Sequence, residues 1–260
     1  MKLQGIFPAI TTPFDHNGDL YKVKVQHNIE KWNRTGLSGY VVCGSTGESV
    51  MLTEHEKLQL WEWVAASAAP EKQLIAGTGV ESVRETVSLT NRAAGMGYKA
   101  VMVRTPHYYK NLINNPSAQM LYYRAVADQA KIPLIIYNWP QATGVDISPD
   151  AVAELSHHPN IIAVKESSGN LEKVMQMIND VKPGFHVLVG SAPTLAPSFA
   201  VGAVGAILAF ANAAPYATIC IWEAHRTREP RTEQTTRPAK LPDYRARRLK
   251  AGKGPKLWDA

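Results

Sequence analysis

Residues 161–169, IIAVKESSG, join a continuous apolar run to a lysine. Residues 161–164 are typical of a strand that is buried on both faces, as in a parallel sheet. Lysine is almost never fully buried unless it has a partner or a function. Lys165 is therefore either the first solvated residue after the strand or a functional group held at the end of the strand. The remaining sequence decides between these two interpretations.

The chain contains eight short β-rich runs, and most of them are continuously apolar rather than alternating. Helical patterns lie between them. Thr53 and Glu56 form a capping-box pattern, and Ser148-Pro149 opens another helix. Further helices are expected over residues 82–94, 117–130 and 171–181. Strands are expected over residues 5–11, 39–45, 73–79, 100–106, 133–138, 161–167, 186–192 and 205–212.

The eightfold alternation of strand and helix predicts an α/β fold, a (β/α)8 TIM barrel over residues 1–225. A doubly wound open sheet is the alternative. That fold usually carries a glycine-rich dinucleotide-binding sequence after its first strand, and TTPF (11–14) stands there instead. We therefore favour the barrel.

Composition restricts the class of protein. The chain has 260 residues, of which 45% are hydrophobic, enough for one large barrel core. It has no apolar run of about 18 residues, so no membrane span is expected. The N-terminal MKLQGIFPAITTPF lacks the features of a signal peptide. Cys43 and Cys220 each lie in an apolar run, which predicts reduced core residues of a cytoplasmic protein.

The positive charge is confined to one segment. The net charge is +6, but residues 226–260 hold 11 Lys and Arg against 4 Asp and Glu, so the rest of the chain is almost neutral. A basic segment indicates either a nucleic-acid or acidic partner, or a solvated end. Because neither interleaved aromatic residues nor a nucleic-acid motif occurs there, we favour the solvated end and expect no nucleic-acid partner.

In a (β/α)8 barrel, the residues that follow the strands form the active site. Here these residues are rich in hydroxyl groups and include Lys165, Tyr137, Ser45, Thr46 and Tyr108. A lysine inside the barrel mouth is desolvated, which lowers the pKa of its amine toward neutrality. A neutral amine can attack a ketone and form a Schiff base. The sequence therefore predicts Schiff-base chemistry at Lys165.

Two further parts of such a site are available. Tyr137, one strand away, can relay protons, and the Ser45-Thr46-Gly47 segment offers backbone N–H groups for a carboxylate. Simpler interpretations remain open. Ser45 with Glu48 could form a capping box, and tyrosines at strand ends often only pack. The histidines lack metal-ligand spacing, so we expect surface or loop residues and no metal at His107, His157 and His158.

Five segments then match a known family in their order along the chain. They resemble the site segments of the dihydrodipicolinate synthase / N-acetylneuraminate lyase family of class I aldolases. The resemblance covers residues 5 to about 225, and five motifs in the same order are far more specific than any one of them. The segments are GSTGE (44–48), TPHYY (105–109), YNWP (137–140), KESSG (165–169) and GAILAFAN (205–212).

The resemblance implies a role for each site residue. Lys165 forms the Schiff base with pyruvate or a pyruvate-derived 2-keto acid, and Tyr137 donates and accepts protons. Ser45 lies in a proton relay between Tyr137 and Tyr108, and Tyr108 is contributed by a neighbouring subunit. The residues implied to bind the keto-acid carboxylate are Thr46, Gly47 and Ile207.

The resemblance also implies the partners. The second substrate is of the aldehyde type, and neither a metal nor an organic cofactor is needed. Family members are commonly tetramers built from dimers, so we expect a homo-oligomer, either a dimer or a tetramer.

The chain departs from the family pattern after YNWP. True dihydrodipicolinate synthases carry an arginine there that holds the carboxylate of aspartate semialdehyde, and the matching residue is Ala142. An alanine cannot make a bidentate bond to a carboxylate. In its overall sequence pattern the chain more closely resembles 4-hydroxy-2-oxoglutarate aldolases. We also predict that Trp139 narrows the pocket for the second substrate. The alternatives are a synthase proper or a non-catalytic keto-acid-binding protein of the same fold.

The second departure lies at the C-terminus. Family chains usually run some tens of residues longer and end in a small helical domain packed on the barrel. Residues 226–260 show little helical periodicity, and only TRPAKL (236–241) looks like the family pattern. We hypothesise that this basic tail is a truncated or frameshifted remnant of the helical domain.

Overall fold

Eight parallel strands form one ring in the computed structural model, which describes residues 3–227. The hypothesis about the tail concerns residues that, apart from Arg226 and Thr227, lie outside this range. Neighbouring strands pair in the order β1-β8-β7-β6-β5-β4-β3-β2, and a parallel bridge between Ala9 and Val41 closes the ring. The strands are β1 (Gly5–Pro8), β2 (Gly39–Val42), β3 (Gln73–Gly77), β4 (Ala100–Arg104), β5 (Leu134–Asn138), β6 (Ile161–Glu166), β7 (His186–Val189) and β8 (Gly205–Leu208).

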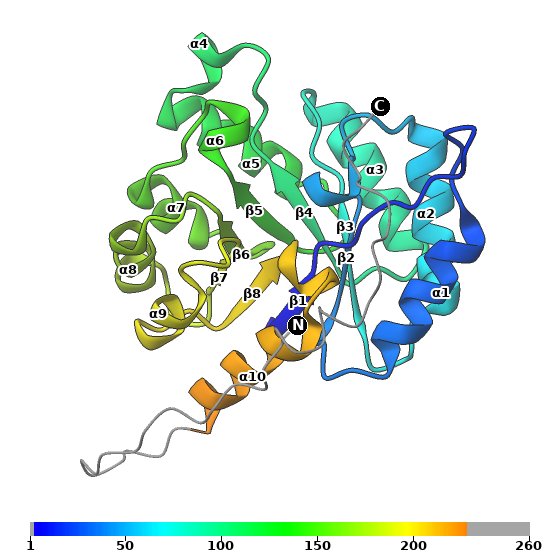
Figure 1. Cartoon of the computed structure of the whole chain (residues 1–260). Helices are drawn as coiled ribbons and strands as arrows, with labels where there is room; N and C mark the ends of the chain where they lie inside the picture. The colour runs from blue at the N-terminus through cyan, green and yellow to red at the C-terminus, as the bar shows by residue number, and fades with distance from the viewer. Residues whose placement is uncertain (1–2, 228–260) are drawn as a thin grey trace, which may run out of the picture. The chain divides into compact units, whose positions relative to one another are not determined.

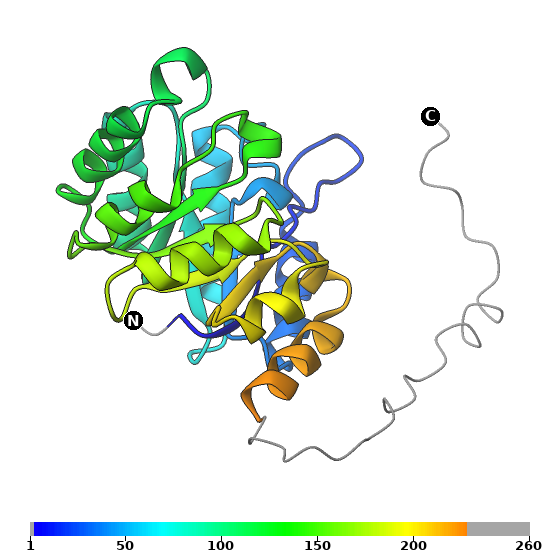
Figure 2. The same cartoon turned by 90° about the vertical axis from the view of Figure 1, so that its left-hand side faces the viewer.

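Helices surround this ring, as Figure 1 and the turned view in Figure 2 show. The predicted (β/α)8 barrel is therefore confirmed, and the open-sheet alternative is wrong. Short helices α4 (Lys110–Ile113) and α6 (Pro140–Thr143) and the 3-10 turns η1 (Ser45–Gly47) and η2 (Phe210–Asn212) lie after strands β4, β5, β2 and β8. The longer helices are α1 (Lys22–Asn33), α2 (Glu54–Ser67), α3 (Val83–Gly95), α5 (Pro116–Ala127), α7 (Pro149–Ser156), α8 (Leu171–Asp180), α9 (Leu195–Ala200) and α10 (Pro215–Arg226).

Local capping sequences determine where several helices begin. Thr53 accepts a hydrogen bond from the backbone N–H of Glu56, whose carboxylate accepts one from the backbone of Thr53 in return, so the capping box opens α2. Ser148 caps α7 by accepting from the N–H of Ala151, and proline follows at the first helical position. The predicted helix starts at these sites are confirmed.

The hydrophobic core has two layers, because successive side chains of a strand point to opposite faces. The outer layer lies between the strands and the helices, and includes Tyr40, Trp61 and Phe199. The inner layer fills the barrel with side chains from all eight strands. Its members are Leu3, Phe7, Ala9, Val41, Ile75, Ala100, Met102, Ile135, Tyr137, Ala163, Leu188 and Ile207.

The two cysteines differ in their surroundings. Cys43 is buried in the outer layer as predicted, but Cys220 is exposed on α10, so the prediction of a core residue is wrong there. α10 buries only Thr218 among the described residues, and an apolar run on a helix covers its exposed face as well as its buried one. None of the helices in the described part of the chain is long and apolar enough to cross a membrane.

Candidate active site

The two-residue period of the strands carries three polar side chains toward the inside of the barrel. Met102 on β4 belongs to the inner layer, so Arg104 continues the same row. On β6, Ala163 belongs to the inner layer and Lys165 follows it by two residues, so Lys165 also points inward. Tyr137 on β5 is itself an inner-layer residue. In the sheet register Tyr137 is the partner of both Arg104 and Lys165. One end of the barrel therefore gathers an arginine, a tyrosine and a lysine on adjacent strands.

Lys165 is a buried lysine without a counterion in the described part of the chain. Its exposed fraction is 4%, and no carboxylate lies within ion-pair distance of its amine in residues 3–227. Burial alone lowers the pKa of the Lys165 amine from 10.5 to about 7. The amine Nζ lies 4.0 Å from the centroid of the Tyr137 ring. Near neutral pH a large share of this amine is uncharged and able to act as a nucleophile.

The hydroxyl of Tyr137 faces the loop after β2. Its Oη lies 3.3 Å from Ser45 Oγ, and either hydroxyl can donate the hydrogen bond. Burial raises the pKa of Tyr137, and the hydrogen bond with the Ser45 hydroxyl offsets part of the increase. A protonated phenol that exchanges a hydrogen bond with a neighbouring hydroxyl is suited to passing a proton back and forth.

The loop after β2 is a single turn, η1, held in an unusual backbone conformation. Two non-glycine residues with left-handed φ angles of 58°, Cys43 and Glu48, stand on either side of it. The residue that caps the turn is Gly44, so the capping-box interpretation of Ser45 and Glu48 is wrong. Within the described chain no hydrogen bond uses the backbone N–H of Ser45 or Thr46. Both donors are available to an anion.

Two further predicted residues border this turn or the barrel interior. Gly47 is buried, and a Cβ there would lie 2.8 Å from the Ile10 carbonyl oxygen, so only glycine lets the turn pack this closely. Thr12 Oγ1 donates to the Gly47 carbonyl at 2.7 Å and holds the turn against the loop after β1. Ile207 lies in the inner layer on β8 and is completely buried.

Tyr108 lies apart from the other predicted residues in this single chain. Its side chain is 76% exposed and packs edge-on against Tyr109, with ring centroids 5.0 Å apart. No hydrogen bond among the described residues joins it to Ser45 or Tyr137. The packing-pair interpretation therefore describes its contacts here, and its predicted role across a subunit interface stays a prediction.

A buried network behind the site supports the ends of β5 and β6. Glu166 points outward from β6 and accepts hydrogen bonds from Asn138 Nδ2 at 2.8 Å and from the Ser168 N–H at 2.6 Å. Lys173 on α8 forms ion pairs with Asp146 and, at 3.6 Å, with Glu166. Because Asn138 and Glu166 directly follow Tyr137 and Lys165, this network fixes the strand ends that carry the two reactive groups.

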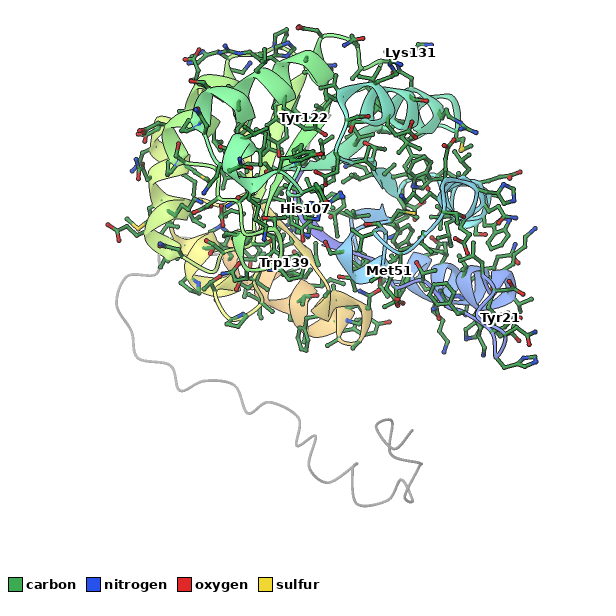
Figure 3. All side chains as sticks on the ribbon, turned by 90° about the horizontal axis from the view of Figure 1, so that it is seen from above. Tyr21, Met51, His107, Tyr122, Lys131 and Trp139 are labelled. Carbon is green, nitrogen blue, oxygen red and sulfur yellow. The ribbon has the colours of Figure 1, made fainter. Side chains whose placement is uncertain are left out.

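A cavity of about 250 Å³ opens beside Tyr137 and Ser45. Trp139 stacks on Tyr137 with ring centroids 6.4 Å apart and forms part of its wall. Viewed from above, His107 and Trp139 lie near the middle of the barrel (Figure 3). The residues that line the cavity are Ser45, Val50, Arg104, His107, Tyr137, Trp139, Ala142 and Thr143.

Comparison with known proteins assigns the family. Residues 2–239 match the model of the Dihydrodipicolinate synthetase family. The chain belongs to this family. Its members are class I aldolases, and the chain is an enzyme of that class.

Individual relatives cover most of the chain. A 4-hydroxy-tetrahydrodipicolinate synthase of Methanothrix thermoacetophila is 39% identical over 219 residues, which are 83% of this chain and 72% of the relative. The structure of the dihydrodipicolinate synthase of Acinetobacter baumannii with pyruvate is 31% identical, with a TM-score of 0.82 over 86% of this chain and 77% of that one. YagE, a prophage protein of E. coli K12 also solved with pyruvate, is 30% identical with a TM-score of 0.82 over 86% of this chain and 76% of that one.

Within this family fold, Arg104 of the cavity wall was not predicted from the sequence. It lies inside the strand expected over residues 100–106, whose first four residues are all apolar and do not mark an inward face. His107 lies in the loop after β4, as predicted, and it also lines the cavity and lies 3.0 Å from Glu81. The other two histidines differ from each other, since His158 pairs with Asp128 at 3.0 Å while His157 is exposed. No cluster of His, Cys, Asp or Glu suited to a metal occurs in the described residues.

Proposed function

We propose that this family member uses Lys165 to form a Schiff base with pyruvate or a pyruvate-derived 2-keto acid, and makes or breaks a carbon–carbon bond to an aldehyde. The observation that carries the proposal is the buried, unpaired Lys165 amine beneath the ring of Tyr137. Two relatives of similar fold were solved with pyruvate, which supports the same class of ligand here.

The chemistry follows from the arrangement of these groups. The neutral Lys165 amine attacks the keto carbon of pyruvate, and the Tyr137 hydroxyl gives a proton to the departing oxygen, which leaves as water. The resulting iminium draws electrons, so the neighbouring carbon gives a proton back to the Tyr137 oxygen and an enamine forms. The enamine carbon then bonds to the carbonyl carbon of the aldehyde, whose oxygen takes a proton from the Tyr137 hydroxyl as the iminium forms again. Hydrolysis of the new iminium releases the product and restores the amine.

The carboxylate of the keto acid needs donors close to Lys165. The free backbone N–H groups of Ser45 and Thr46 and the hydroxyl of Thr46 are suited to it. Gly47 keeps this turn tight against the barrel, and the backbone of Ile207 borders the same interior. We assign carboxylate binding to this turn and the proton relay to Tyr137 and Ser45.

A trapping experiment tests the proposal. Folded protein is incubated with pyruvate, reduced with borohydride and digested, and the adduct is located by mass spectrometry. We expect one reduced adduct on Lys165, none in Lys165→Ala, and none when lactate, which has no ketone, replaces pyruvate. If protein with intact circular dichroism gives no adduct, the chain is instead a non-catalytic keto-acid-binding protein of this fold.

A second candidate is 4-hydroxy-tetrahydrodipicolinate synthesis from pyruvate and aspartate semialdehyde. The name of the Methanothrix relative favours it, and Ala142 in the cavity wall argues against it because the family arginine is missing there. Incubation of the pyruvate-loaded enzyme with aspartate semialdehyde distinguishes the two. Formation of the cyclic product at a rate above that with other aldehydes would favour the synthase.

We further propose a cytoplasmic homo-oligomer, a dimer or tetramer, in which a neighbouring subunit completes the relay through Tyr108. The exposed tyrosine pair at 108 and 109 supports this, because large aromatic side chains on a surface often mark an interface. Light scattering after size exclusion is expected to give a dimer or tetramer. A monomer with full trapping activity would contradict the shared site.

A further inference from the structure

Arg104 has a hydrogen-bond donor directed at no protein acceptor. Its side chain is 16% exposed and lines the cavity beside Tyr137. Nη1 donates to the Gly79 carbonyl at 2.5 Å, and Nη2 lies 3.5 Å from Glu81. Nε is buried and has no hydrogen-bond partner in residues 3–227. Buried polar atoms are nearly always paired, so an unpaired one in a cavity wall points to a ligand.

The guanidinium is only partly neutralised by its neighbour. The 3.5 Å separation from Glu81 is longer than a normal hydrogen bond. The carboxylate of Glu81 is also engaged elsewhere, because its Oε2 accepts from the backbone N–H groups of His107 at 3.0 Å and Tyr108 at 3.1 Å. Arg104 therefore keeps positive charge at the edge of the cavity, and its buried Nε–H has no acceptor within residues 3–227.

The same cavity contains the position at which the family arginine is absent. Ala142 and Arg104 both line it, one from the segment after β5 and the other from β4. Arginine is the side chain best suited to a carboxylate, because its planar fork of donors matches the two oxygens. A carboxylate beside Arg104 would also lie in the barrel mouth that holds Tyr137 and Lys165, where the aldehyde must approach.

We propose that Arg104 binds a carboxylate on the aldehyde substrate, so that this enzyme selects anionic aldehydes without an arginine at position 142. This inference rests on the proposed function, since it assigns the second substrate of the same site. Its alternative is a purely structural role, in which Arg104 only holds the Gly79 carbonyl.

The test compares pairs of aldehydes that differ in charge. The pyruvate-loaded enzyme is given glyoxylate or glycolaldehyde, which have the same number of carbons, and then succinic semialdehyde or butanal. We expect the wild type to prefer the carboxylated member of at least one pair. In Arg104→Met the ratio of the two kcat/KM values for that pair falls by about 10- to 100-fold, with the loss mainly in KM. Arg104→Lys recovers part of the ratio.

Lys57→Met is the matched control. Lys57 lines the adjoining cavity of about 330 Å³ together with Arg104, but it does not line the cavity beside Tyr137. Removing its charge is expected to leave the preference unchanged. If Lys57→Met lowers the ratio of the two kcat/KM values as much as Arg104→Met does, the preference comes from the positive charge of the region and not from a contact with Arg104. That result would overturn the inference.

The remaining outcomes separate the inference from the proposed function. If the Lys165 adduct forms but no carboxylated aldehyde is preferred or consumed, the assignment to Arg104 is wrong and the Schiff-base proposal stands. If Arg104→Met lowers kcat/KM equally for charged and neutral aldehydes, the assignment is also wrong, and Arg104 has only a structural role. If the wild type forms no adduct with pyruvate, the proposed function fails, and the inference falls with it.

Discussion

Lys165 and Lys173 are both buried, and they lie close together in the chain, but their surroundings are opposite. Lys165 points into the barrel from β6, has no counterion within residues 3–227 and has a pKa of about 7. Lys173 lies on α8 outside the barrel and is paired with Asp146 and with Glu166, whose side chain is fully buried. The difference indicates that burial lowers the pKa of a lysine strongly where no carboxylate stabilises its charge, as at Lys165.

The strongest test of this contrast removes the reactive amine. In Lys165→Met, turnover is expected to fall on the order of 10⁴-fold or more, because the variant lacks the amine proposed to form the covalent intermediate. Steady-state kinetics with pyruvate and an aldehyde measure the loss. Lys72→Met, which removes another lysine whose pKa burial lowers, is the control and should retain activity. Turnover in Lys165→Met at more than a hundredth of the wild-type rate would contradict the assignment.

The next largest effect is expected from the proton relay. Tyr137→Phe keeps the ring over the Lys165 amine but removes the hydroxyl that faces Ser45. A missing general acid-base group lowers kcat by roughly 10²- to 10⁴-fold. Burst and single-turnover measurements should assign the loss to Schiff-base formation.

Tyr98→Phe provides the comparison for this variant. It removes a buried hydroxyl that donates to the Trp61 carbonyl, away from the barrel mouth. In this variant the free energy of unfolding should fall, while the rate of proton transfer should stay unchanged. Equal effects of the two variants on kcat would argue against a relay at Tyr137.

The same substitution at the two lysines should change stability in opposite directions. In the unfolded chain Lys165 has the ordinary pKa, so between about pH 7 and 10.5 the unfolded state binds more protons, and the free energy of unfolding rises with pH. Below pH 7 the full penalty of burying the charge is present. Lys165→Met is therefore expected to raise the free energy of unfolding by roughly 2–4 kcal/mol at pH 6, and by much less at pH 10.

Lys173→Met should instead lower the free energy of unfolding by about 3 kcal/mol, because it leaves the buried Glu166 without its cation. Urea unfolding at pH 6 and pH 10 measures both variants. Destabilisation by both substitutions at pH 6 would mean that Lys165 is also paired in solution.

The smallest effect is expected at Gly190, which packs against the side chains of Lys165 and Ser167. A Cβ there would lie 2.9 Å from Lys165 Cε and 1.8 Å from Ser167 Oγ. Gly190→Ala must displace one of them, which lowers the free energy of unfolding by roughly 1–3 kcal/mol and slows adduct formation. Gly95→Ala on α3, where a Cβ meets no atom within 4 Å, is the control. An unchanged adduct rate in Gly190→Ala would show that Lys165 tolerates the shift.

The sequence predicted the parts of the site that follow strands. Continuous apolar runs gave the barrel, and the polar residues after them led to Lys165, Tyr137 and Ser45, because a barrel brings strand ends together whatever their separation in sequence. The pairing of Asp146 with Lys173 was not predictable in this way, since it joins a loop to a helix through tertiary packing.

The positions of two other residues, Arg104 and Cys220, were not predicted correctly from sequence patterns. Arg104 was not predicted because the run before it, residues 100–103, is continuously apolar, so only the structure shows which residues of this strand point inward. Cys220 was predicted to be buried from its apolar run, but a run on a helix distributes its residues around the helix axis, and this one faces outward.

The most direct test of the account is the pH dependence of adduct formation at Lys165. The rate of pyruvate trapping at this residue is measured between pH 5 and pH 11 by mass spectrometry, with Lys173 followed in the same digests. Trapping at Lys165 is expected to rise with a midpoint near pH 7, as the buried amine loses its proton, while Lys173 stays unmodified at neutral pH. A midpoint near pH 10, as for an exposed lysine, or equal trapping at both residues would contradict it.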